Sequence, residues 1–500
     1  MIASTTAGKV QGIERDGVIQ LRGVPYATAT RFGAPEAVPE WADVRECAAF
    51  GPIAPQNPSP LETMLGAGSA PTSEDCLSLN VFTPALDDAA RPVLVWIHGG
   101  GFTAGAGSIP WYSGSRLARQ GEVVVVTINY RLGSFGFLDV EPLLGPDFAG
   151  SGNNGIRDQI AALHWVRDNI AGLGGDPGKV TVFGESAGGM SVATLLGTPD
   201  AAGLFRSAIA QSGAAEVVLA PDAAATIAER FVAETGLTAA TAGELLTLPM
   251  QALLDAQQSL STKLAKEGEH FLPFAPVVDG TVLPEPPLNA IRRGSAAGVS
   301  LLTGTTSDEW NLFHVMARAN GRMDDDGLRR RVKRAVGAEL ADELIATYRA
   351  GRPDQSADDL WCAMATDRVF RVPCTRLAEA QSAHQPATFV YEFSYRSTAF
   401  GGDMGACHAI DVPFVFDNVD RRGVEFLLGG VDDRARELSH VTSRAWTAMA
   451  TNGSPHHDEL PDWPAYTPTS RNVMELGVTR TVHDAPRDAE RAVWPIPATS

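Results

Sequence analysis

Hydrophobic positions in the first half of the chain fall into short continuous runs. Each run is rich in β-branched residues and contains almost no charge. The runs are VLVWI at 93–97, VVVVTIN at 123–129 and VTVF at 180–183. Short apolar runs without a polar alternation are typical of strands that a parallel sheet buries on both faces. We therefore predict three neighbouring strands of such a sheet.

Between these runs, apolar residues follow a different spacing. From Ile156 to Ile170 apolar residues recur every three or four positions, which predicts an amphipathic helix that ends before Gly172. The stretch 187–196 predicts another helix, directly after the third strand. Strands that alternate with helices indicate an α/β fold, with a central, mostly parallel β-sheet and helices on both faces.

The second half of the chain has a different pattern. The stretches of roughly 215–295 and 315–385 are mostly helical in pattern and rich in Ala and Leu, and we interpret them as insertions that form a cap over the sheet. Two more strands are predicted at 299–304 and 387–393. With no internal repeat, residues 1–500 are interpreted as a single large domain that carries helical cap insertions.

Charge and composition narrow the class of protein. The chain of 500 residues has a net charge of -19, which argues against nucleic acid or an anionic membrane as a partner. The longest apolar run, 123–128, is too short to cross a membrane, and residues 1–17 lack the pattern of a secretory signal. We expect a cytoplasmic enzyme, either a monomer or a small homo-oligomer.

The five cysteines are odd in number, widely spread and never arranged as C-x-x-C. This distribution predicts buried reduced thiols rather than disulfides or metal ligands. The sequence implies no metal and no organic cofactor.

The candidate chemistry begins at Ser186, in the pattern G-x-S-x-G. Five letters prove little in a glycine-rich chain, but here they lie between a predicted strand and a predicted helix. A sharp turn of this kind exposes the serine hydroxyl at a helix N-terminus, and it needs Gly184 and Gly188 because neighbouring chain passes close by. Upstream, the strand at 93–97 ends in HGGGF, whose glycine N–H groups could point at one spot, as an oxyanion hole requires.

A serine nucleophile also needs a base and an acid that orients the base. Asp308 and Glu309 both follow the strand predicted at 299–304, and the pattern does not choose between them. Of the eight histidines after Ser186, His408 is favoured because it lies in a loop of small residues before an apolar run. The required chain order of serine, acid and histidine is satisfied.

With these residues in place, the chain resembles the type B carboxylesterases, a family of α/β-hydrolase fold that includes cholinesterases and bacterial para-nitrobenzyl esterases. The resemblance extends over nearly the whole chain and in family order. It is carried by LRGVPYA (21–27), SEDCLSLNVFTP (73–84), HGGGF (98–102), NYRLGSFGF (129–137), GDPGKVTVFGESAGG (175–189), GTTSDEWNLF (304–313), GACHAIDVPFVF (405–416) and WPAYTP (463–468).

The resemblance implies a role for each candidate residue. It implies Ser186 as nucleophile, Glu309 as acid and His408 as base. The other implied site residues are Gly100, Gly101 and Ala187 in the oxyanion hole, with Glu185 and Ser212 as supporting neighbours of the triad. It also implies two structural ion pairs, Arg31 with Glu74 and Arg131 with Asp158.

Two departures from the family pattern are visible. Secreted members pair the cysteine that matches Cys76 with another cysteine, and Ala54 stands at that partner position here. The loop between them contains no aromatic residue, whereas cholinesterases place there a tryptophan that stacks on quaternary ammonium. A specialist for choline esters is therefore not expected.

The predicted function is hydrolysis of carboxylic esters with short to medium acyl or aromatic groups, through an acyl-enzyme. The alternative is that the same triad acts mainly on amide, carbamate or bulky aromatic diester bonds. A non-catalytic binding protein on this fold is disfavoured because Ser186, Glu309 and His408 are all present. The candidate pocket residues are Phe271, Leu272 and Phe274, for which ordinary core packing is the competing interpretation.

Overall fold

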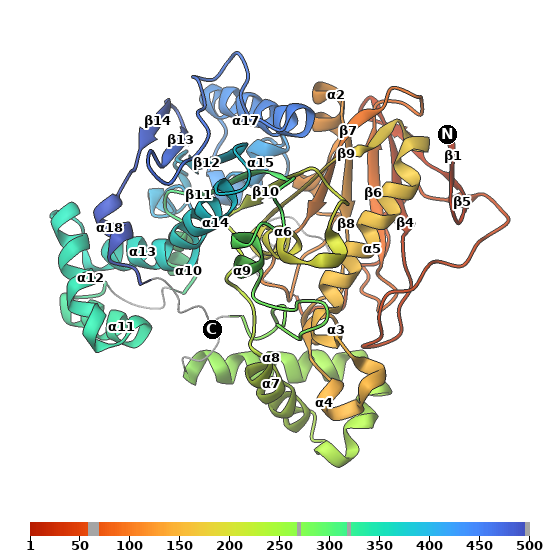
Figure 1. The fold of residues 1–500 in the computed structure, drawn as a ribbon, viewed down its shortest axis with the longest axis horizontal. Helices are drawn as coiled ribbons and strands as arrows, with labels where there is room; N and C mark the ends of the chain where they lie inside the picture. Colours follow the sequence, from red (N-terminus) through yellow and green to blue (C-terminus); the bar gives the residue numbers. More distant parts are fainter. Residues whose placement is uncertain (59–69, 268–271, 318–321, 496–500) are drawn as a thin grey trace.

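A computed structural model describes residues 1–58, 70–267, 272–317 and 322–495 of the chain (Figure 1). In this described part, eleven strands form one large sheet in the order β14-β13-β12-β11-β10-β9-β7-β8-β6-β4-β3. The strands are β3 (Ile13–Arg15), β4 (Val18–Pro25), β6 (Ser78–Thr83), β7 (Arg91–Ile97), β8 (Val124–Ile128), β9 (Gly175–Glu185), β10 (Ser207–Gln211), β11 (Ser300–Thr306), β12 (Thr388–Phe393), β13 (Asn472–Leu476) and β14 (Arg480–Asp484).

The middle of the sheet is parallel and its edges are antiparallel. All pairs from β8 across to β13 are parallel, whereas β14 on one side and β6, β4 and β3 on the other pair antiparallel. A separate small sheet near the N-terminus consists of β1 (Ile2–Thr5), β2 (Gly8–Gln11) and β5 (Arg45–Glu46). The three runs predicted as buried parallel strands are confirmed as parts of β7, β8 and β9, and the two later runs as parts of β11 and β12.

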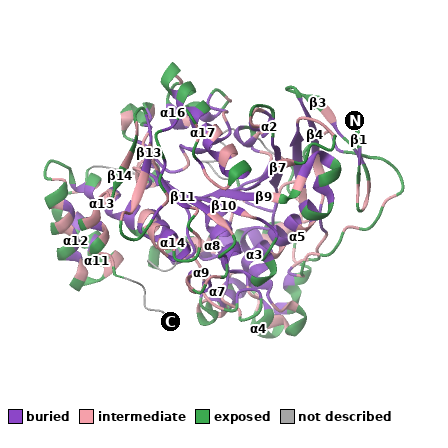
Figure 2. Ribbon diagram, turned by 45° about the horizontal axis from the view of Figure 1, so that its top comes forward, coloured by how far each residue is buried: buried purple, intermediate pink, exposed green. Residues whose placement is uncertain are grey.

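Both faces of the central strands are covered, which explains why β7 and β8 are almost entirely apolar. In β7, Val95 faces one hydrophobic core and Trp96 faces the other, because successive side chains of a strand point to opposite faces. Figure 2 shows these strands buried between helices whose outer sides are exposed. The core that contains Val95 includes α3 (Gly133–Phe137), α5 (Asn154–Asn169) and α6 (Ala187–Gly197); the core that contains Trp96 includes α2 (Ser115–Gly121), α15 (Val412–Val415), α16 (Val424–Leu428) and α17 (Asp433–Asn452).

The two segments interpreted as insertions are indeed mostly helical. The first holds α7 (Pro221–Glu234), α8 (Met250–Glu267) and α9 (Pro287–Arg292), and the second holds α10 (Trp310–Ala317), α11 (Asp325–Val336), α12 (Ala338–Gly351), α13 (Ala357–Thr366) and α14 (Val372–Ser382). Helices α7 and α8 pack on each other, and α11, α12 and α13 share a small core of their own, at two separate edges of the molecule (Figure 1). In contrast, α14 packs on β11 and β12, and α9 packs on α6, so these two helices belong to a layer beside the sheet.

The structure contains both expected ion pairs, and it buries the five cysteines. Arg131 pairs with Asp158, Nη2 to Oδ1 at 2.7 Å, and both side chains are buried; Arg31 pairs with Glu74. All five cysteines are buried and free, including Cys76, which shares a core with Ala54. Among the described residues, no helix combines the length and apolarity needed to span a bilayer.

Candidate active site

Ser186 occupies a sharp turn between a strand and a helix. Strand β9 ends at Glu185 and α6 begins at Ala187, which leaves Ser186 alone at the turn with φ 56° and ψ -125°. A residue other than glycine pays about 1–3 kcal/mol for such a backbone, so the surroundings must hold it there. The backbone N–H of Ser186 donates to the carbonyl of Gln211 at 3.0 Å, and its own carbonyl accepts from Met190 N at 2.8 Å.

The glycines around the turn are required by close backbone contacts. A Cβ on Gly188 would lie 2.0 Å from the carbonyl oxygen of Ile97, and a Cβ on Gly184 would lie 2.6 Å from the same atom. A Cβ on Gly99 would lie 3.0 Å from the Cβ of Ser186. These contacts bring the glycine loop after β7 directly against the turn that carries the serine.

The same arrangement leaves backbone donors beside Ser186. Gly100 and Gly101 have φ of 108° and 61°, and within the described residues their N–H groups donate to no other group. Ala187 is the first residue of α6, where an N–H has no acceptor within its own helix. The positive end of the helix dipole lies at the same place. Three donors are thus available near the hydroxyl.

Glu309 and His408 meet at the carboxyl end of the sheet. His408 Nδ1 lies 2.6 Å from Glu309 Oε2, and both side chains are buried. The other carboxylate oxygen of Glu309, Oε1, accepts hydrogen bonds from Ser212 Oγ at 2.6 Å and from Thr306 N at 2.8 Å. Both oxygens of the carboxylate therefore have hydrogen-bond partners, which hold it in one orientation.

Asp308, the other candidate acid, faces away from His408. Its Oδ2 accepts from Arg396 Nη1 and from the backbone N–H of Ala406, each at 2.9 Å. The carboxylate of Asp308 thereby fastens the loop that precedes His408. Of the two neighbouring acids that the pattern left open, the structure brings only Glu309 to the imidazole.

The imidazole of His408 also contacts a second carboxylate. His408 Nε2 is 3.2 Å from Glu185 Oε1, and no hydrogen bond joins it to Ser186 Oγ in the described structure. Burial raises the pKa of Glu185 well above its ordinary value. Burial lowers the pKa of His408, but the carboxylates of Glu185 and Glu309 outweigh it, so the net pKa of His408 is raised. The two carboxylates thus stabilise the imidazolium that forms when His408 takes up a proton.

Three neighbours of His408 were not singled out in the sequence. Phe313 and Phe370 pack against the imidazole with ring centroids 5.2 and 4.8 Å away. Asp411 is fully buried, and its Oδ2 accepts from Gln211 Nε2 at 3.0 Å and from Tyr391 Oη at 2.9 Å. Burial, helped by Glu309, raises the pKa of Asp411 to about 6. The one available signal for Asp411 was an acid three positions after His408, inside an otherwise apolar run.

Ser186 and His408 open into one cavity of about 390 Å³. Among the described residues that line it there is no lysine or arginine, and Glu185 and His408 are its one carboxylic acid and its one imidazole. Apolar and aromatic side chains form much of its wall: Ile109, Trp111, Tyr112, Met190, Leu272, Leu312, Phe313, Phe370 and Leu427. Clefts of this size and polarity are typical of sites for small uncharged molecules.

The three pocket candidates differ in position. Leu272 lines the cavity and approaches Gly101. Phe274 is instead completely buried and packs edge-on against Phe231 in the core, 6.2 Å between ring centroids, because its turn of chain points inward. Phe271 lies outside the described residues.

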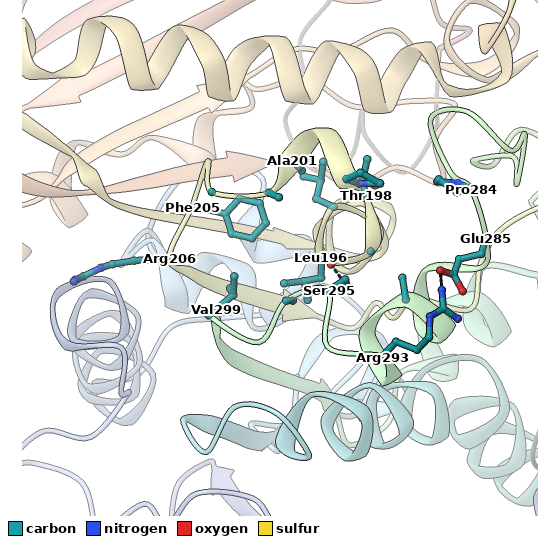
Figure 3. Close-up of a pocket in the computed structure, with 18 of the residues that line it drawn as sticks. Leu196, Thr198, Ala201, Phe205, Arg206, Pro284, Glu285, Arg293, Ser295 and Val299 are labelled. Atoms are coloured by element: carbon teal, nitrogen blue, oxygen red, sulfur yellow. Dashed lines mark hydrogen bonds and ion pairs between the residues drawn. The ribbon is translucent and has the colours of Figure 1, made fainter.

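A larger cavity, about 750 Å³, opens at the opposite end of α6 (Figure 3). Its charged side chains are Arg206, Glu285 and Arg293, of which the last two form an ion pair. Its serine, Ser295, donates its hydroxyl proton to the Leu196 carbonyl at 2.8 Å. The described lining places no histidine beside that hydroxyl, and the catalytic candidates lie at the other end of the helix. The described residues contain no group of three or more potential ligands placed to hold a metal ion.

Comparison with known proteins identifies the family. A model of the carboxylesterase family matches residues 1–494. The chain belongs to this family. A para-nitrobenzyl esterase of Bacillus subtilis (strain 168) is 40% identical over 495 residues, which cover 98% of this chain and 97% of that protein. This carboxylesterase is therefore a carboxylic ester hydrolase, as its sequence pattern predicted.

Solved structures agree with the family and with the fold. A carboxylesterase of Geobacillus stearothermophilus is similar with a TM-score of 0.89 at 38% identity, covering 99% of this chain and 100% of that one. An esterase from anaerobic Clostridium hathewayi, described as able to hydrolyse aliphatic aromatic polyesters, reaches a TM-score of 0.79 at 30% identity, with 99% and 97% covered. The predicted α/β-hydrolase fold is confirmed.

Proposed function

We propose that this carboxylesterase cleaves carboxylic esters with Ser186 as nucleophile, His408 as base and Glu309 as the acid that orients the base. The observation that carries the proposal is the 2.6 Å contact between His408 and Glu309 in the wall of the cavity that also exposes Ser186. A hydrogen bond between serine and histidine is often long in a free enzyme and tightens when substrate binds.

The reaction follows from the positions of these groups. His408 Nε2 takes the proton of the Ser186 hydroxyl as the oxygen attacks the ester carbonyl, and it then gives that proton to the departing alcohol. Water attacks the acyl-enzyme in the same way and releases the acid. Glu309 keeps the Nδ1 proton in place and stabilises the imidazolium that forms, and the elevated pKa of His408 is consistent with this role.

The N–H groups of Gly100, Gly101 and Ala187 are proposed to bind the oxyanion. Their positions beside Ser186 support this role, because each is a rigid backbone donor at the place where the carbonyl oxygen becomes negative. One such donor is typically worth about 2.7–4 kcal/mol in the transition state. Ser212 is proposed to support Glu309 through its 2.6 Å hydrogen bond, and Glu185 to stabilise charge on His408.

The cavity favours an uncharged ester. Its described lining has no lysine or arginine to pair with an anionic substrate. Aromatic side chains, among them Trp111 and Phe313, offer flat apolar surface for an aromatic acyl or alcohol group. We further propose that the segments around α8 and α10 act as the cap, because Gln257 on α8 and Leu312 on α10 contribute to the lining.

The decisive experiment combines a variant with a covalent probe. Ser186→Ala should abolish hydrolysis of para-nitrophenyl butyrate without a change in the midpoint of urea unfolding. An organophosphate should add to the wild type on the tryptic peptide 180–206, which contains Ser186, and should not add to the variant. Ser295→Ala, at the far end of α6, is the matched control and should keep both activity and labelling. Labelling of Ser186→Ala to the same extent would refute the assignment.

A panel of substrates tests the alternative bonds. The same attack would serve an amide, a carbamate or an aromatic diester, since each presents a carbonyl to Ser186. We expect kcat/KM to be highest for neutral aromatic or short acyl esters and to fall by about tenfold or more when a carboxylate is placed on the acyl group, because the described lining of the cavity contains no lysine or arginine. A higher kcat/KM for the matched amide or carbamate would move the assignment to that bond.

A further inference from the structure

A small cavity of about 50 Å³ lies where the C-terminal segment covers the sheet, away from the catalytic candidates. Its walls come from the ends of β11 and β12, from α14, and from the turns before α18 (Asp488–Ala492), which adjoin one another in Figure 1. Four arginines line it, together with one carboxylate, that of Glu392. The arginines are Arg371, Arg471, Arg487 and Arg491.

Several hydrogen-bond donors in this wall are unused. The buried Nε atoms of Arg371, Arg471 and Arg487 and the hydroxyl of Tyr466 have no hydrogen-bond partner among the described residues. Arg371 Nε lies 3.3 Å from a carboxylate oxygen of Glu392, but without hydrogen-bond geometry. Tyr466 is only 2% exposed, so its hydroxyl is not turned outward. Unpaired buried donors are costly, so a wall with four of them suits a negatively charged acceptor.

The existing ion pairs do not exhaust these arginines. Glu392 pairs with Arg487 and Arg371, and Asp488, which is not in the wall, pairs with Arg471 and Arg491 at 3.0 Å each. Two more carboxylates outside the wall also pair with these arginines, Asp367 with Arg371 and Glu379 with Arg491. A guanidinium carries five N–H donors in a planar fork, so these pairs still leave donors such as the Nε atoms unused. The carboxylates around the arginines therefore match them in number, and it is the unused Nε donors and the Tyr466 hydroxyl that suit an anion.

The backbone at this cavity is strained as well. Arg471, Ala485 and Arg487 line it and adopt left-handed conformations with φ of 47°, 45° and 55°. Such conformations cost of order 1–3 kcal/mol each and concentrate where a structure clamps a ligand. The side chains of Arg487 and Arg491 are 29% and 33% exposed, which leaves a route from solvent into the cavity.

We propose that this cavity binds a small oxyanion, a carboxylate or a phosphate, through its arginines and the hydroxyl of Tyr466. At about 10–15 Å³ for each water-sized group, 50 Å³ holds an anion of a few heavy atoms, such as acetate or phosphate. Forked arginine donors match the paired oxygens of both ions.

The anion would stabilise the part of the fold that supports the acid loop. Arg371 Nη2 donates to the carbonyl of Ser307 at 2.8 Å, two residues before Glu309, and the neighbouring Phe370 packs on His408. Binding at the arginines therefore adds to the free energy of unfolding. The inference does not depend on the proposed triad, because its test measures stability and anion position rather than turnover.

The first test is thermal unfolding of the full chain at constant ionic strength, with chloride replaced stepwise by phosphate or by acetate. We expect a saturable rise in Tm with one or both oxyanions, and the anion with the lower apparent Kd identifies the preferred chemistry. Tyr466→Phe should raise that Kd about tenfold, since a hydrogen bond to a charged group is lost. Tyr395→Phe, which changes a tyrosine elsewhere, should leave the response unchanged.

Further measurements keep the proposal falsifiable. If Tyr466→Phe does not fold, Arg491→Gln replaces it and should likewise weaken the response. Crystals grown with selenate should show an anomalous peak within hydrogen-bond distance of the Tyr466 hydroxyl. The same Tm rise in chloride as in the oxyanions, an unchanged Kd in folded Tyr466→Phe or Arg491→Gln, or a cavity without the peak would each overturn the proposal.

Discussion

Replacing Glu309 by glutamine tests the proposed triad, because it changes which ring nitrogen of His408 carries the proton. In the wild type, Oε1 of Glu309 accepts from Ser212 Oγ and Thr306 N, while Oε2 faces His408 Nδ1 at 2.6 Å. A carboxylate satisfies both sides because each of its oxygens accepts. A glutamine amide has one oxygen and one NH₂ group, so it can accept hydrogen bonds either from Ser212 and Thr306 or from His408, but not from both.

The surroundings decide which way the amide points. The backbone N–H of Thr306 can only donate, so the amide oxygen takes the Oε1 position and the NH₂ group faces His408 Nδ1. Nδ1 must then accept, and its proton moves to Nε2, which is the nitrogen that has to receive the proton of Ser186. The opposite orientation sets two donors against each other at a cost of about 1–3 kcal/mol.

The expected loss of activity has two causes. The imidazole of His408 carries its proton on Nε2 instead of Nδ1, and the negative charge that stabilises the imidazolium is gone. Triads that lose their acid in this way fall by about 10³–10⁴-fold in kcat, or about 4–5.5 kcal/mol of activation free energy. We therefore expect that drop for Glu309→Gln with para-nitrophenyl butyrate at pH 8, with an unchanged urea midpoint. Steady-state kcat at saturating substrate is the measurement, because a loss of substrate binding would appear in KM instead.

Asp308→Asn is the matched control. In this variant the side-chain amide oxygen at position 308 can still accept from Ala406 N, so the loop before His408 stays in place. We therefore expect kcat to remain within about tenfold of the wild type. The reasoning is refuted if Glu309→Gln keeps more than one tenth of the wild-type kcat. It is equally refuted if Asp308→Asn loses as much as Glu309→Gln.

Two further outcomes are expected. Glu185→Gln removes a carboxylate 3.2 Å from His408 that raises the pKa of the imidazole, so the acid limb of the kcat/KM profile should move to lower pH; a limb that stays in place or moves to higher pH contradicts this. Asp158→Asn leaves the buried Arg131 without its counter-charge and should lower the free energy of unfolding by about 3–5 kcal/mol in urea; a loss below about 1 kcal/mol would show that the pair is dispensable.

The elements predicted from the sequence are those whose pattern is local. A strand buried on both faces needs an apolar residue at every position, so β8 is visible in the letters VVVTI alone. The helix α5 is visible for the same reason, since one of its faces meets the core at every turn. By contrast, β6 has a mixed pattern, and its partners β4 and β8 lie far away in the chain.

The site also contains both features that depend on local sequence and features that depend on the folded chain. The turn at Ser186 is local, so strand, glycine pattern and helix predicted its geometry. The choice of Glu309 over Asp308 came from resemblance to a family, because neighbouring side chains are separated only by the direction in which the folded loop turns them. Phe313 and Phe370 reach His408 from other parts of the chain, and no spacing in the sequence records that proximity.

The buried thiols have a practical consequence for experiments on this enzyme. All five cysteines are inside the protein, and burial raises the pKa of each thiol, to about 11 for Cys47 and about 12 for Cys362 and Cys374. A thiol that stays protonated and hidden does not react with maleimides at neutral pH. One cysteine introduced on the surface would then be the sole labelling site, so a fluorophore or spin label could report on the helices around the cavity without removal of any native residue.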